Sequence, residues 1–457
     1  MIFQQLVNDE AGCLSYLIGC GRAGVAMIVD PGRDRVGDYV ALARRKGLTI
    51  THVVDTHVHA DHVSGNQALA AQTGATVYIH AAAEAKYRHL PVEDGNELRV
   101  GTVSLRVLHT PGHTPDSIAL LVTDDSRGPE PWFVLTGDTL FVGDVGRPDF
   151  GGERAAAELY RSLTGRLLVL DDSVEVYPAH GAGSMCGRAM SSKTGSTIGF
   201  ERRFNPALRA RDEEEFVRNL LAGLLPTPPN FKAIIERNRS VAVLTRPAPQ
   251  ALPPRGVREL IDEGAVVLDV RTSAEYGEGH VPGAVNVSIE SPQFVERCGW
   301  FIPPDAVIVL VAASPTDPGR ALTGLSRVGL DGVTGYLQRG MTDWRGEGLP
   351  TEQLAQISVH DLATWREEQP DLVVVDVREP FEWDEGHIAG ALHLPMREAV
   401  TRRGEVPADR PKAVLCAGGL RSSTVISVLK RSGARGPWYN VSGGMTAWLK
   451  AGYAVVR

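Results

Sequence analysis

Thr56-His-Val-His-Ala-Asp-His62 places three histidines and one aspartate within seven consecutive positions. The residues just before it, Thr51-His-Val-Val-Asp55, are typical of a buried strand, so the histidines follow a strand end. Alternate side chains of an extended segment share one face, and we therefore expect His57 and His59 to face the same cation. This stretch predicts a metal site within a strand-rich α/β domain.

Three more side chains of the same chemistry follow apolar strands later in this region. They are His113 in Thr110-Pro-Gly-His-Thr114, Asp138 in Thr136-Gly-Asp-Thr139 and His180 in Tyr177-Pro-Ala-His180. Asp61 and His62 are expected to enter the next helix, on the side neighbouring His57 and His59. Imidazole and carboxylate ligands without thiolate suit iron, zinc or manganese.

The composition excludes several classes of partner. The 457 residues include 47 Lys and Arg against 55 Asp and Glu, a net charge of −8 without a basic patch, so we expect no nucleic-acid partner. No apolar run is long enough to span a bilayer and the first residues lack the pattern of a secretory signal, so we expect no membrane partner. Five cysteines are few, odd in number and widely spread, which favours the reducing cytoplasm.

Residues 246–255, Arg-Pro-Ala-Pro-Gln-Ala-Leu-Pro-Pro-Arg, contain four prolines and predict an extended linker after a domain of residues 1–245. Beyond this linker the chain repeats itself. Val266-Val-Leu-Asp-Val-Arg271 recurs as Val373-Val-Val-Asp-Val-Arg378, at an offset of 107 residues. We therefore predict two homologous domains, 256–352 and 353–457, in which strands alternate with helices around a parallel sheet.

The second repeat contains a cysteine in a setting that favours an anionic sulfur. In Ala413-Val-Leu-Cys-Ala-Gly-Gly-Leu-Arg421, Cys416 ends a strand and a helix follows. Loop amides, the helix N-terminus and Arg421 would surround the sulfur with positive charge and stabilise a nucleophile or its persulfide. Gly418 and Gly419 allow the loop to turn its N–H groups inward.

The first 225 residues or so resemble the metallo-β-lactamase superfamily, which carries a His-x-His-x-Asp-His motif on an αββα sandwich. Two of its branches fit the ligand set. Glyoxalase II-like hydrolases attack a thioester with two metals, such as two zincs, whereas persulfide dioxygenases use one Fe(II) and O2. Two segments favour the dioxygenase branch: Gly143-Asp-Val-Gly-Arg-Pro-Asp-Phe150 is similar to its Gly-Arg-Thr-Asp-Phe segment, with Pro148 for Thr, and Asn205-Pro-Ala-Leu208 to its Asn-Pro-Arg-Leu.

The resemblance also assigns roles to single residues. It implies that one Fe(II) is held by His57, His113 and Asp138. The remaining members of the set would contact these ligands or hold a second metal: His59, Asp61, His62 and His180. Arg147 would order the loop around the metal and the substrate. Cys186 lies six residues after His180 and is either a sulfur acceptor beside the metal or an inert thiol.

Both repeats resemble rhodanese domains, and the second includes the closing Gly-Gly-Met-x-x-Trp motif. Four residues separate Cys416 from Arg421, the spacing of sulfurtransferases, whereas the related dual-specificity phosphatases have five. The first repeat has Val309-Leu-Val-Ala-Ala-Ser-Pro-Thr-Asp-Pro318 at the corresponding place, without a cysteine. Cys298 precedes that strand and is not expected to replace it. We therefore predict one catalytically silent copy and one active copy, with Cys416 and Arg421 as catalytic residues.

The combination resembles the bacterial fusions of a persulfide dioxygenase with a sulfurtransferase. This resemblance implies an α/β multidomain protein that oxidises glutathione persulfide, or another thiol persulfide, with O2 to sulfite and thiol. Cys416 would then exchange sulfane sulfur between persulfide, sulfite and thiosulfate during sulfide detoxification. A homo-oligomer is compatible with the sequence. Two alternatives stay open: a two-metal thioester hydrolase, and a sulfur carrier or sensor without turnover.

Overall fold

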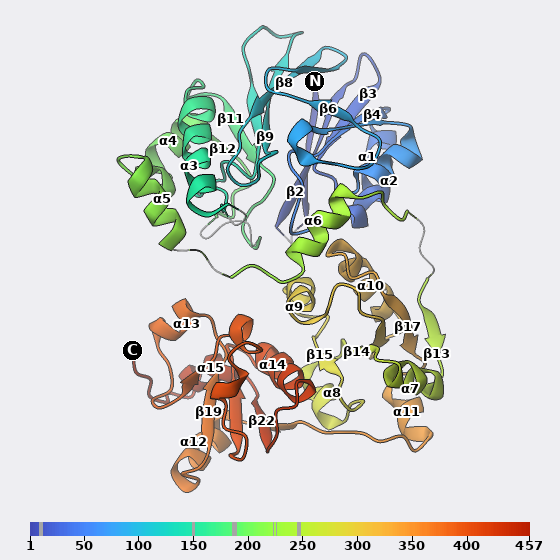
Figure 1. The fold of residues 1–457 in the computed structure, drawn as a ribbon, viewed down its shortest axis with the longest axis vertical. Coiled ribbons are helices and arrows are strands. Elements are labelled where there is room, and N and C mark those ends of the chain that lie inside the picture. Colours follow the sequence, from blue (N-terminus) through green and yellow to red (C-terminus); the bar gives the residue numbers. More distant parts are fainter. Residues whose placement is uncertain (9–11, 149–150, 185–189, 223, 225, 245–247) are drawn as a thin grey trace. The chain divides into compact units, whose positions relative to one another are not determined.

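The computed structural model describes residues 1–8, 12–148, 151–184, 190–222, 224, 226–244 and 248–457. The chain divides into two compact units (Figure 1). Unit 1 is Met1–Arg246 with Ser326–Gly329, and unit 2 is Pro247–Leu325 with Leu330–Arg457. Among the described residues, no helix has the length and apolar character that crossing a membrane requires.

Unit 1 is built from two sheets with helices outside them. Its strands are β1 (Ile2–Asn8), β2 (Cys13–Cys20), β3 (Val25–Val29), β4 (Thr49–Val54), β5 (Thr76–His80), β6 (Leu90–Val92), β7 (Glu97–Val100), β8 (Val103–His109), β9 (Ile118–Asp124), β10 (Phe133–Gly137), β11 (Glu175–Pro178) and β12 (Ser196–Thr197). Its helices are α1 (Val36–Arg45), α2 (Asn66–Thr73), α3 (Gly152–Ser162), α4 (Ile198–Phe204), α5 (Glu213–Ala222) and α6 (Phe231–Arg239). In the described residues the strand orders are β1-β2-β3-β4-β5-β6 and β12-β11-β10-β9-β8-β7.

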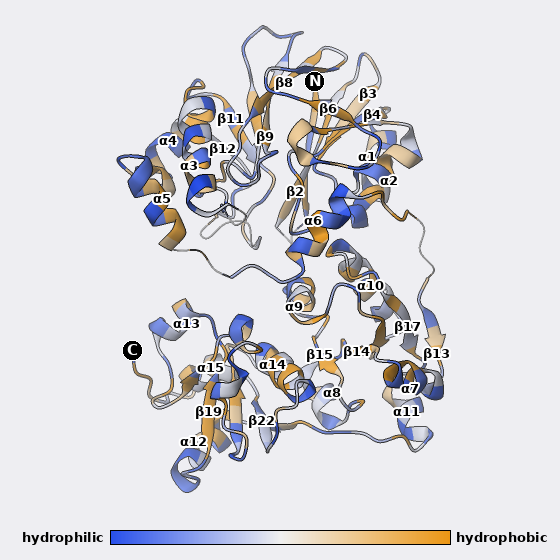
Figure 2. Cartoon of the chain, viewed as in Figure 1, coloured by the Kyte–Doolittle hydropathy of each residue, from blue (hydrophilic) through white to orange (hydrophobic). Residues whose placement is uncertain are grey.

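The alternation of side chains along the strands explains the layers of unit 1. In β2, Leu14, Tyr16 and Ile18 point into the core between the two sheets. Leu17, which lies between them in sequence, packs instead in an outer core with Tyr39 of α1. The hydrophobic colouring of the strands in Figure 2 follows from this double burial. The αββα sandwich expected from the sequence is confirmed.

Unit 2 contains the two repeats. Its strands are β13 (Gln250–Leu252), β14 (Val266–Asp269), β15 (Val285–Asn286), β16 (Ile308–Val311), β17 (Val333–Leu337), β18 (Ala355–Ile357), β19 (Val373–Asp376), β20 (Leu392–His393), β21 (Lys412–Leu415) and β22 (Trp438–Val441). Its helices are α7 (Pro254–Asp262), α8 (Ser273–Glu278), α9 (Phe294–Phe301), α10 (Asp317–Arg327), α11 (Met341–Gly346), α12 (Val359–Glu368), α13 (Pro380–Glu385), α14 (Leu420–Arg431) and α15 (Gly444–Lys450). In the described chain the strand orders are β13-β17-β16-β14-β15 and β18-β22-β21-β19-β20, and the paired strands are parallel as predicted.

The predicted linker is shorter than its proline content indicates. Residues 250–252 form β13 and pair in parallel with β17, and α7 begins at Pro254. The extended backbone that the flanking prolines favour is also compatible with a strand at the edge of a sheet, where a proline need not supply a ladder hydrogen bond. Pro254 in the first turn of α7 is equally compatible, because the N–H that proline lacks has no partner within a helix at that position.

The repeated Asp-Val-Arg motif is structural in both copies. Arg271 donates hydrogen bonds to the Asp269 carboxylate and to the backbone carbonyl of Gly279. Arg378 makes the same contacts with Asp376 and with the carbonyl of Gly386. Each arginine ties the end of a central strand to the helix that follows it, and the copies therefore share this motif whether or not they carry a cysteine.

Candidate metal centre and candidate sulfur-transfer site

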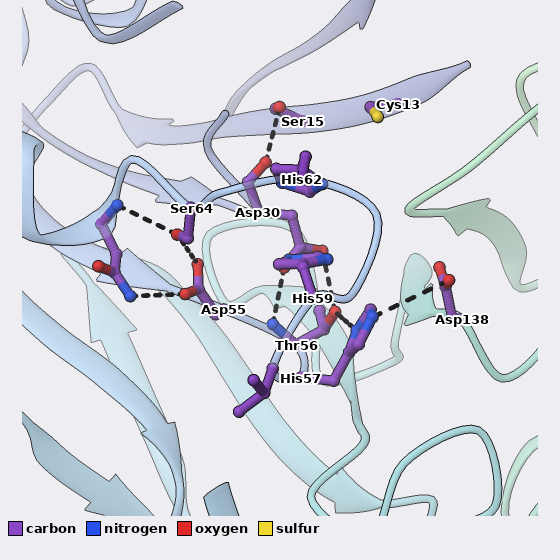
Figure 3. Close-up of polar contacts among 12 residues, drawn as sticks. Cys13, Ser15, Asp30, Asp55, Thr56, His57, His59, His62, Ser64 and Asp138 are labelled. Atoms are coloured by element: carbon purple, nitrogen blue, oxygen red, sulfur yellow. Dashed lines mark hydrogen bonds and ion pairs between the residues drawn. The ribbon is translucent and has the colours of Figure 1, made fainter. Parts of the chain in front are cut away.

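Three predicted ligands converge at one edge of the sandwich in unit 1. His57 follows β4, His113 lies in the loop between β8 and β9, and Asp138 comes directly after β10. Their candidate ligand atoms all lie within 4.8 Å of one another. Asp138 Oδ2 is 3.9 Å from His57 Nε2 and 3.5 Å from His113 Nε2. Figure 3 shows the His57 ring pointing toward Asp138.

The chemistry of these three side chains fits a bound divalent cation. All three are buried, and neither His57 Nε2 nor Asp138 Oδ2 has a hydrogen-bond partner among the described residues. Burial lowers the pKa of His57 well below its usual value. Burial would raise the pKa of Asp138, but the neighbouring His180, His57 and His113 hold it well below the usual range. A neutral imidazole and an ionised carboxylate are the forms that bind a metal.

Hydrogen bonds behind these side chains fix their orientation. His113 Nδ1 donates to the backbone carbonyl of Arg147 at 2.8 Å, and His57 Nδ1 lies 3.0 Å from the Thr56 hydroxyl. Such contacts select the ring nitrogen that faces a metal. Arg147, predicted from the sequence to order this loop, is itself buried, and its carbonyl makes the contact with His113.

His57 and His59 have their rings 4.2 Å apart, but they fall into different groups of candidate ligands, and His59 Nδ1 has no hydrogen-bond partner among the described residues. His59 Nε2 lies 3.1 Å from Asp30 Oδ1, in a second cluster that also contains Asp55. The segment is a loop after β4 rather than a strand, because Asp30 binds the Thr56 backbone N–H at 2.7 Å and its hydroxyl at 3.0 Å. This bend removes the alternation on which the prediction rested.

Asp61 and His62 also differ from their expected position, since α2 begins only at Asn66 and both lie in the loop before it. His180 connects them to the first cluster. Its Nδ1 lies 2.7 Å from Asp138 Oδ1, and its Nε2 lies 2.9 Å from Asp61 Oδ2. Together with Cys13, whose sulfur is 3.5 Å from Asp61 Oδ2, these residues form a third group of possible ligand atoms.

Three residues of this region were missed from the sequence: Asp30, Cys13 and Asp55, which directly follows β4. Asp30 directly follows β3, and a carboxylate after an apolar strand is the same signal that identified Asp138. Cys13 carried no such signal, because it begins a strand and approaches Asp61 only through the fold. Cys186, the predicted alternative sulfur acceptor, lies outside the described residues.

In unit 2, Cys416 lies where the sequence predicts, between β21 and α14, and is buried. The backbone N–H of Gly419 donates to its sulfur at 3.0 Å, and the Ser422 hydroxyl lies 3.5 Å away. Gly419 has a φ of +94°, a conformation that favours glycine. The loop therefore turns a backbone N–H toward the sulfur, as the two glycines indicated.

Arg421 is held in position by a neighbouring carboxylate. Its guanidinium makes two hydrogen bonds to the Glu382 carboxylate of α13, at 2.5 and 2.6 Å. Burial alone would lower the pKa of Arg421, but Glu382 and the nearby Cys416 raise it, so the guanidinium stays charged. Glu382 therefore fixes the position of the Arg421 guanidinium, whose positive charge interacts with the Cys416 sulfur.

The closing Gly-Gly-Met motif supports the cysteine loop from behind. The N–H of Met445 donates to the Cys416 carbonyl at 2.8 Å, and the N–H of Thr446 donates to the Ala417 carbonyl at 3.0 Å. A Cβ on Gly444 would lie 2.1 Å from the Cys416 carbonyl oxygen, so only glycine fits there.

The first copy has the same architecture without the sulfur. Ala312 follows β16 at the place of Cys416, and Gly340 approaches its carbonyl oxygen as Gly444 approaches that of Cys416. Cys298 lies fully buried on α9, and burial raises the pKa of its thiol far above the usual value. A thiol held in its neutral form is a poor nucleophile, as expected for a silent copy.

Family comparisons agree with this division of the chain. The model of the metallo-β-lactamase superfamily matches residues 8–180, and the model of the rhodanese-like domain matches residues 254–347 and 358–451. The chain therefore belongs to the metallo-β-lactamase superfamily, and it joins a domain of that superfamily to two rhodanese-like domains.

Three known proteins show which members of these families the chain is similar to. The crystal structure of a metallo-β-lactamase from Staphylococcus aureus subsp. aureus COL is 31% identical and has a TM-score of 0.67, covering 74% of this chain and 98% of that chain. The human mitochondrial persulfide dioxygenase ETHE1 is 28% identical over 245 residues, 54% of this chain and 90% of the relative. A hydroxyacylglutathione hydrolase from Nitrosococcus oceani is 36% identical over 184 residues, 39% of this chain and 66% of the relative.

Proposed function

We propose that unit 1 oxidises glutathione persulfide, or another small thiol persulfide, at one Fe(II), and that Cys416 exchanges sulfane sulfur with the product. In the first reaction the persulfide, O2 and water yield the thiol, sulfite and two protons. In the second, sulfite attacks the outer sulfur of a Cys416 persulfide, the S–S bond breaks, and thiosulfate and the Cys416 thiolate form. The reverse reaction would load Cys416 from thiosulfate. The similarity to persulfide dioxygenase ETHE1 and the rhodanese-like domains support this pairing.

The observation that carries the proposal is the convergence of His57 Nε2, His113 Nε2 and Asp138 Oδ2. Two imidazoles and one carboxylate are the ligand set of non-haem Fe(II) oxygenases, which leaves coordination positions open. When bound, Fe(II) would supply the redox chemistry that O2 requires. The protein itself has to hold these three atoms in fixed positions. The hydrogen bond from His113 to the Arg147 carbonyl fixes the His113 ring.

The contacts of the outer residues favour one metal over two. Both ring nitrogens of His180 lie against carboxylates, Asp138 Oδ1 on one side and Asp61 Oδ2 on the other. His59 Nε2 lies against Asp30, whereas His59 Nδ1 and His62 Nε2 have no hydrogen-bond partner among the described residues. A second metal would require His180 and Asp61 to exchange these contacts for a cation, whereas the first three ligands need no such rearrangement.

A cavity of about 480 Å³ beside His113 offers room for the organic part of the substrate. Its walls include His109, Pro111, Arg154 and Glu158. The volume lies within the usual range for small-molecule sites. We assign this cavity to the organic part of the thiol persulfide, and we expect the terminal sulfur of this substrate to point toward His113.

Oxygen uptake with glutathione persulfide, measured alongside the metal content, tests the proposal. We expect uptake with about one iron per chain; two zincs per chain without uptake would instead support a thioester hydrolase. Cys416→Ser should keep oxygen uptake and abolish thiosulfate formation, and Cys298→Ser serves as the matched control with both activities kept. Sulfur bound at Cys416 without any turnover would support a carrier.

A further inference from the structure

A cluster of buried nitrogen donors adjoins the Cys416 loop, and part of it comes from the silent copy. Arg297 on α9 is 5% exposed, and its Nε and Nη1 have no hydrogen-bond partner among the described residues. Its Nη2 donates to the neutral amide oxygen of Gln293 at 3.1 Å. A buried guanidinium is costly unless an anion or hydrogen-bond acceptors meet it, so these two N–H groups indicate a place where an anion can bind.

Neighbouring side chains extend the same cluster. Arg397 of the active copy also has buried Nε and Nη1 atoms with no hydrogen-bond partner, and so does Trp300 at its Nε1, within the described chain. Arg397 lies 5.7 Å from the Trp300 ring and donates to Glu296, next to Arg297, at 3.2 Å. Every one of these unpartnered atoms is a donor, which is the pattern of an anion site and not of a cation site.

The acidic residues nearby are already engaged. Glu382 is held by both terminal nitrogens of Arg421, and Arg397 lies between Glu296 and Glu379, at 3.2 and 3.6 Å. Burial raises the pKa of Glu379, which weakens its ability to neutralise a cation. Within the described residues, no carboxylate lies within hydrogen-bond distance of Arg297.

A series of ion pairs connects Arg297 to the Cys416 loop. Glu296, the residue before Arg297, pairs with Arg397, which also lies 3.6 Å from Glu379 at the start of α13, and Glu382 of α13 binds Arg421. Burial lowers the pKa of Arg297, the Cys416 sulfur opposes this shift and Arg421 adds to it. The two copies are also fixed to one another close to this point. Asn286 of the first copy accepts a hydrogen bond from Ser423 at 2.6 Å and donates to Ser427 at 3.0 Å, both on α14. A buried apolar cluster shared by the two copies supports this contact.

We propose that Arg297 of the silent copy and Arg397 of the active copy form an oxyanion subsite beside Cys416 that binds the SO3 group of sulfite or thiosulfate. The inference rests on the proposed sulfur transfer at Cys416. Guanidinium forks bind the oxygens of such anions in pairs. When the Cys416 thiolate attacks the outer sulfur of thiosulfate, the S–S bond breaks and its electron pair leaves with sulfite. The two arginines hold the charge that develops there, which gives the silent copy a role.

The test compares Arg297→Met with Arg258→Met, an exposed arginine on α7, in the full chain. We expect R297M to raise the KM for thiosulfate about tenfold to a hundredfold, the range for loss of a paired charged hydrogen bond, and R258M to leave it unchanged. Loading of Cys416 from glutathione persulfide, which lacks an SO3 group, should stay within threefold of wild type when followed by mass spectrometry. Arg397→Gln is the second variant and should raise the same KM if R297M does not fold.

A binding assay separates this inference from the proposed function. Sulfite should protect Cys416 of the wild-type protein from iodoacetamide, and R297M should require at least tenfold more sulfite for equal protection. Protection without any turnover would refute the sulfur-transfer activity and leave the subsite standing. An unchanged KM for thiosulfate in R297M and R397Q, or an equal loss with thiosulfate and with glutathione persulfide, would overturn the subsite.

Discussion

Substitution of Gly444 by alanine tests whether the closing motif sets the geometry of the cysteine loop. Gly444 has a φ of +50°, and an added Cβ would lie 2.1 Å from the Cys416 carbonyl oxygen and 2.7 Å from that of Ala417. These distances are about 1 Å or more short of an ordinary contact. The start of α15 therefore has to withdraw from the loop in the G444A variant.

The cost follows from the interactions that this withdrawal breaks. A left-handed conformation costs a residue with a side chain about 1–2 kcal/mol, and each of the two hydrogen bonds from Met445 and Thr446 contributes about 1 kcal/mol. We expect a loss of roughly 3–4 kcal/mol in the free energy of unfolding, within the 5–15 kcal/mol typical of a domain. A displacement of the sulfur by about 1 Å can lower the rate of transfer about a hundredfold.

Urea unfolding and thiosulfate formation should be measured on the same G444A preparation, with oxygen uptake as the internal reference for unit 1. Gly340→Ala is the matched control, since Gly340 has a φ of +58° and its added Cβ would lie 2.9 Å from the Ala312 carbonyl of the silent copy. G340A should weaken folding and keep sulfur transfer within about threefold. Wild-type transfer rates in a destabilised G444A protein would refute the reasoning.

Three further substitutions address the metal centre and the stability of unit 2. Asp138→Ala should lose iron and oxygen uptake together while sulfur exchange at Cys416 persists, as metal analysis and an oxygen electrode would record; retained iron would contradict its assignment as a ligand. Arg378→Met leaves Asp376 buried without its partner and should cost about 3–5 kcal/mol in urea unfolding, most of it recovered by adding Asp376→Leu. Burial lowers the pKa of His280 from 6.5 to about 4, so only the unfolded chain takes up this proton between these values. The contribution of neutral His280 to the free energy of unfolding should therefore be fully present above pH 6.5 and should fall by roughly 3 kcal/mol toward pH 4. In the His280→Gln variant the free energy of unfolding should decline less over this pH range.

Much of the candidate metal centre could be located from the sequence because its residues obey a local rule. His57, His113 and Asp138 each follow a strand, and the strand ends of a sandwich meet at one edge. The same rule did not predict the orientation of His59, because it treats the segment after β4 as extended. The bend comes from Asp30, 26 positions before Thr56 in the chain, and no local pattern describes that contact.

The amino-acid sequence by itself determined the architecture of this protein: the αββα sandwich, the two related domains and the copy that carries the cysteine. The two related domains follow from apolar periodicity and an internal repeat, and the silent copy follows from one residue difference. The αββα sandwich follows from the resemblance of the His-x-His-x-Asp-His segment to the metallo-β-lactamase superfamily. None of these properties requires knowledge of contacts between distant residues. Only the tertiary structure decided that His180 binds two carboxylates and that Arg297 of the silent copy is buried next to the Glu296–Arg397 pair, which joins the two copies. Arg297 precedes Cys416 by 119 positions. Its Nε and Nη1, which have no hydrogen-bond partner among the described residues, indicate an anion site only because packing buries them away from water.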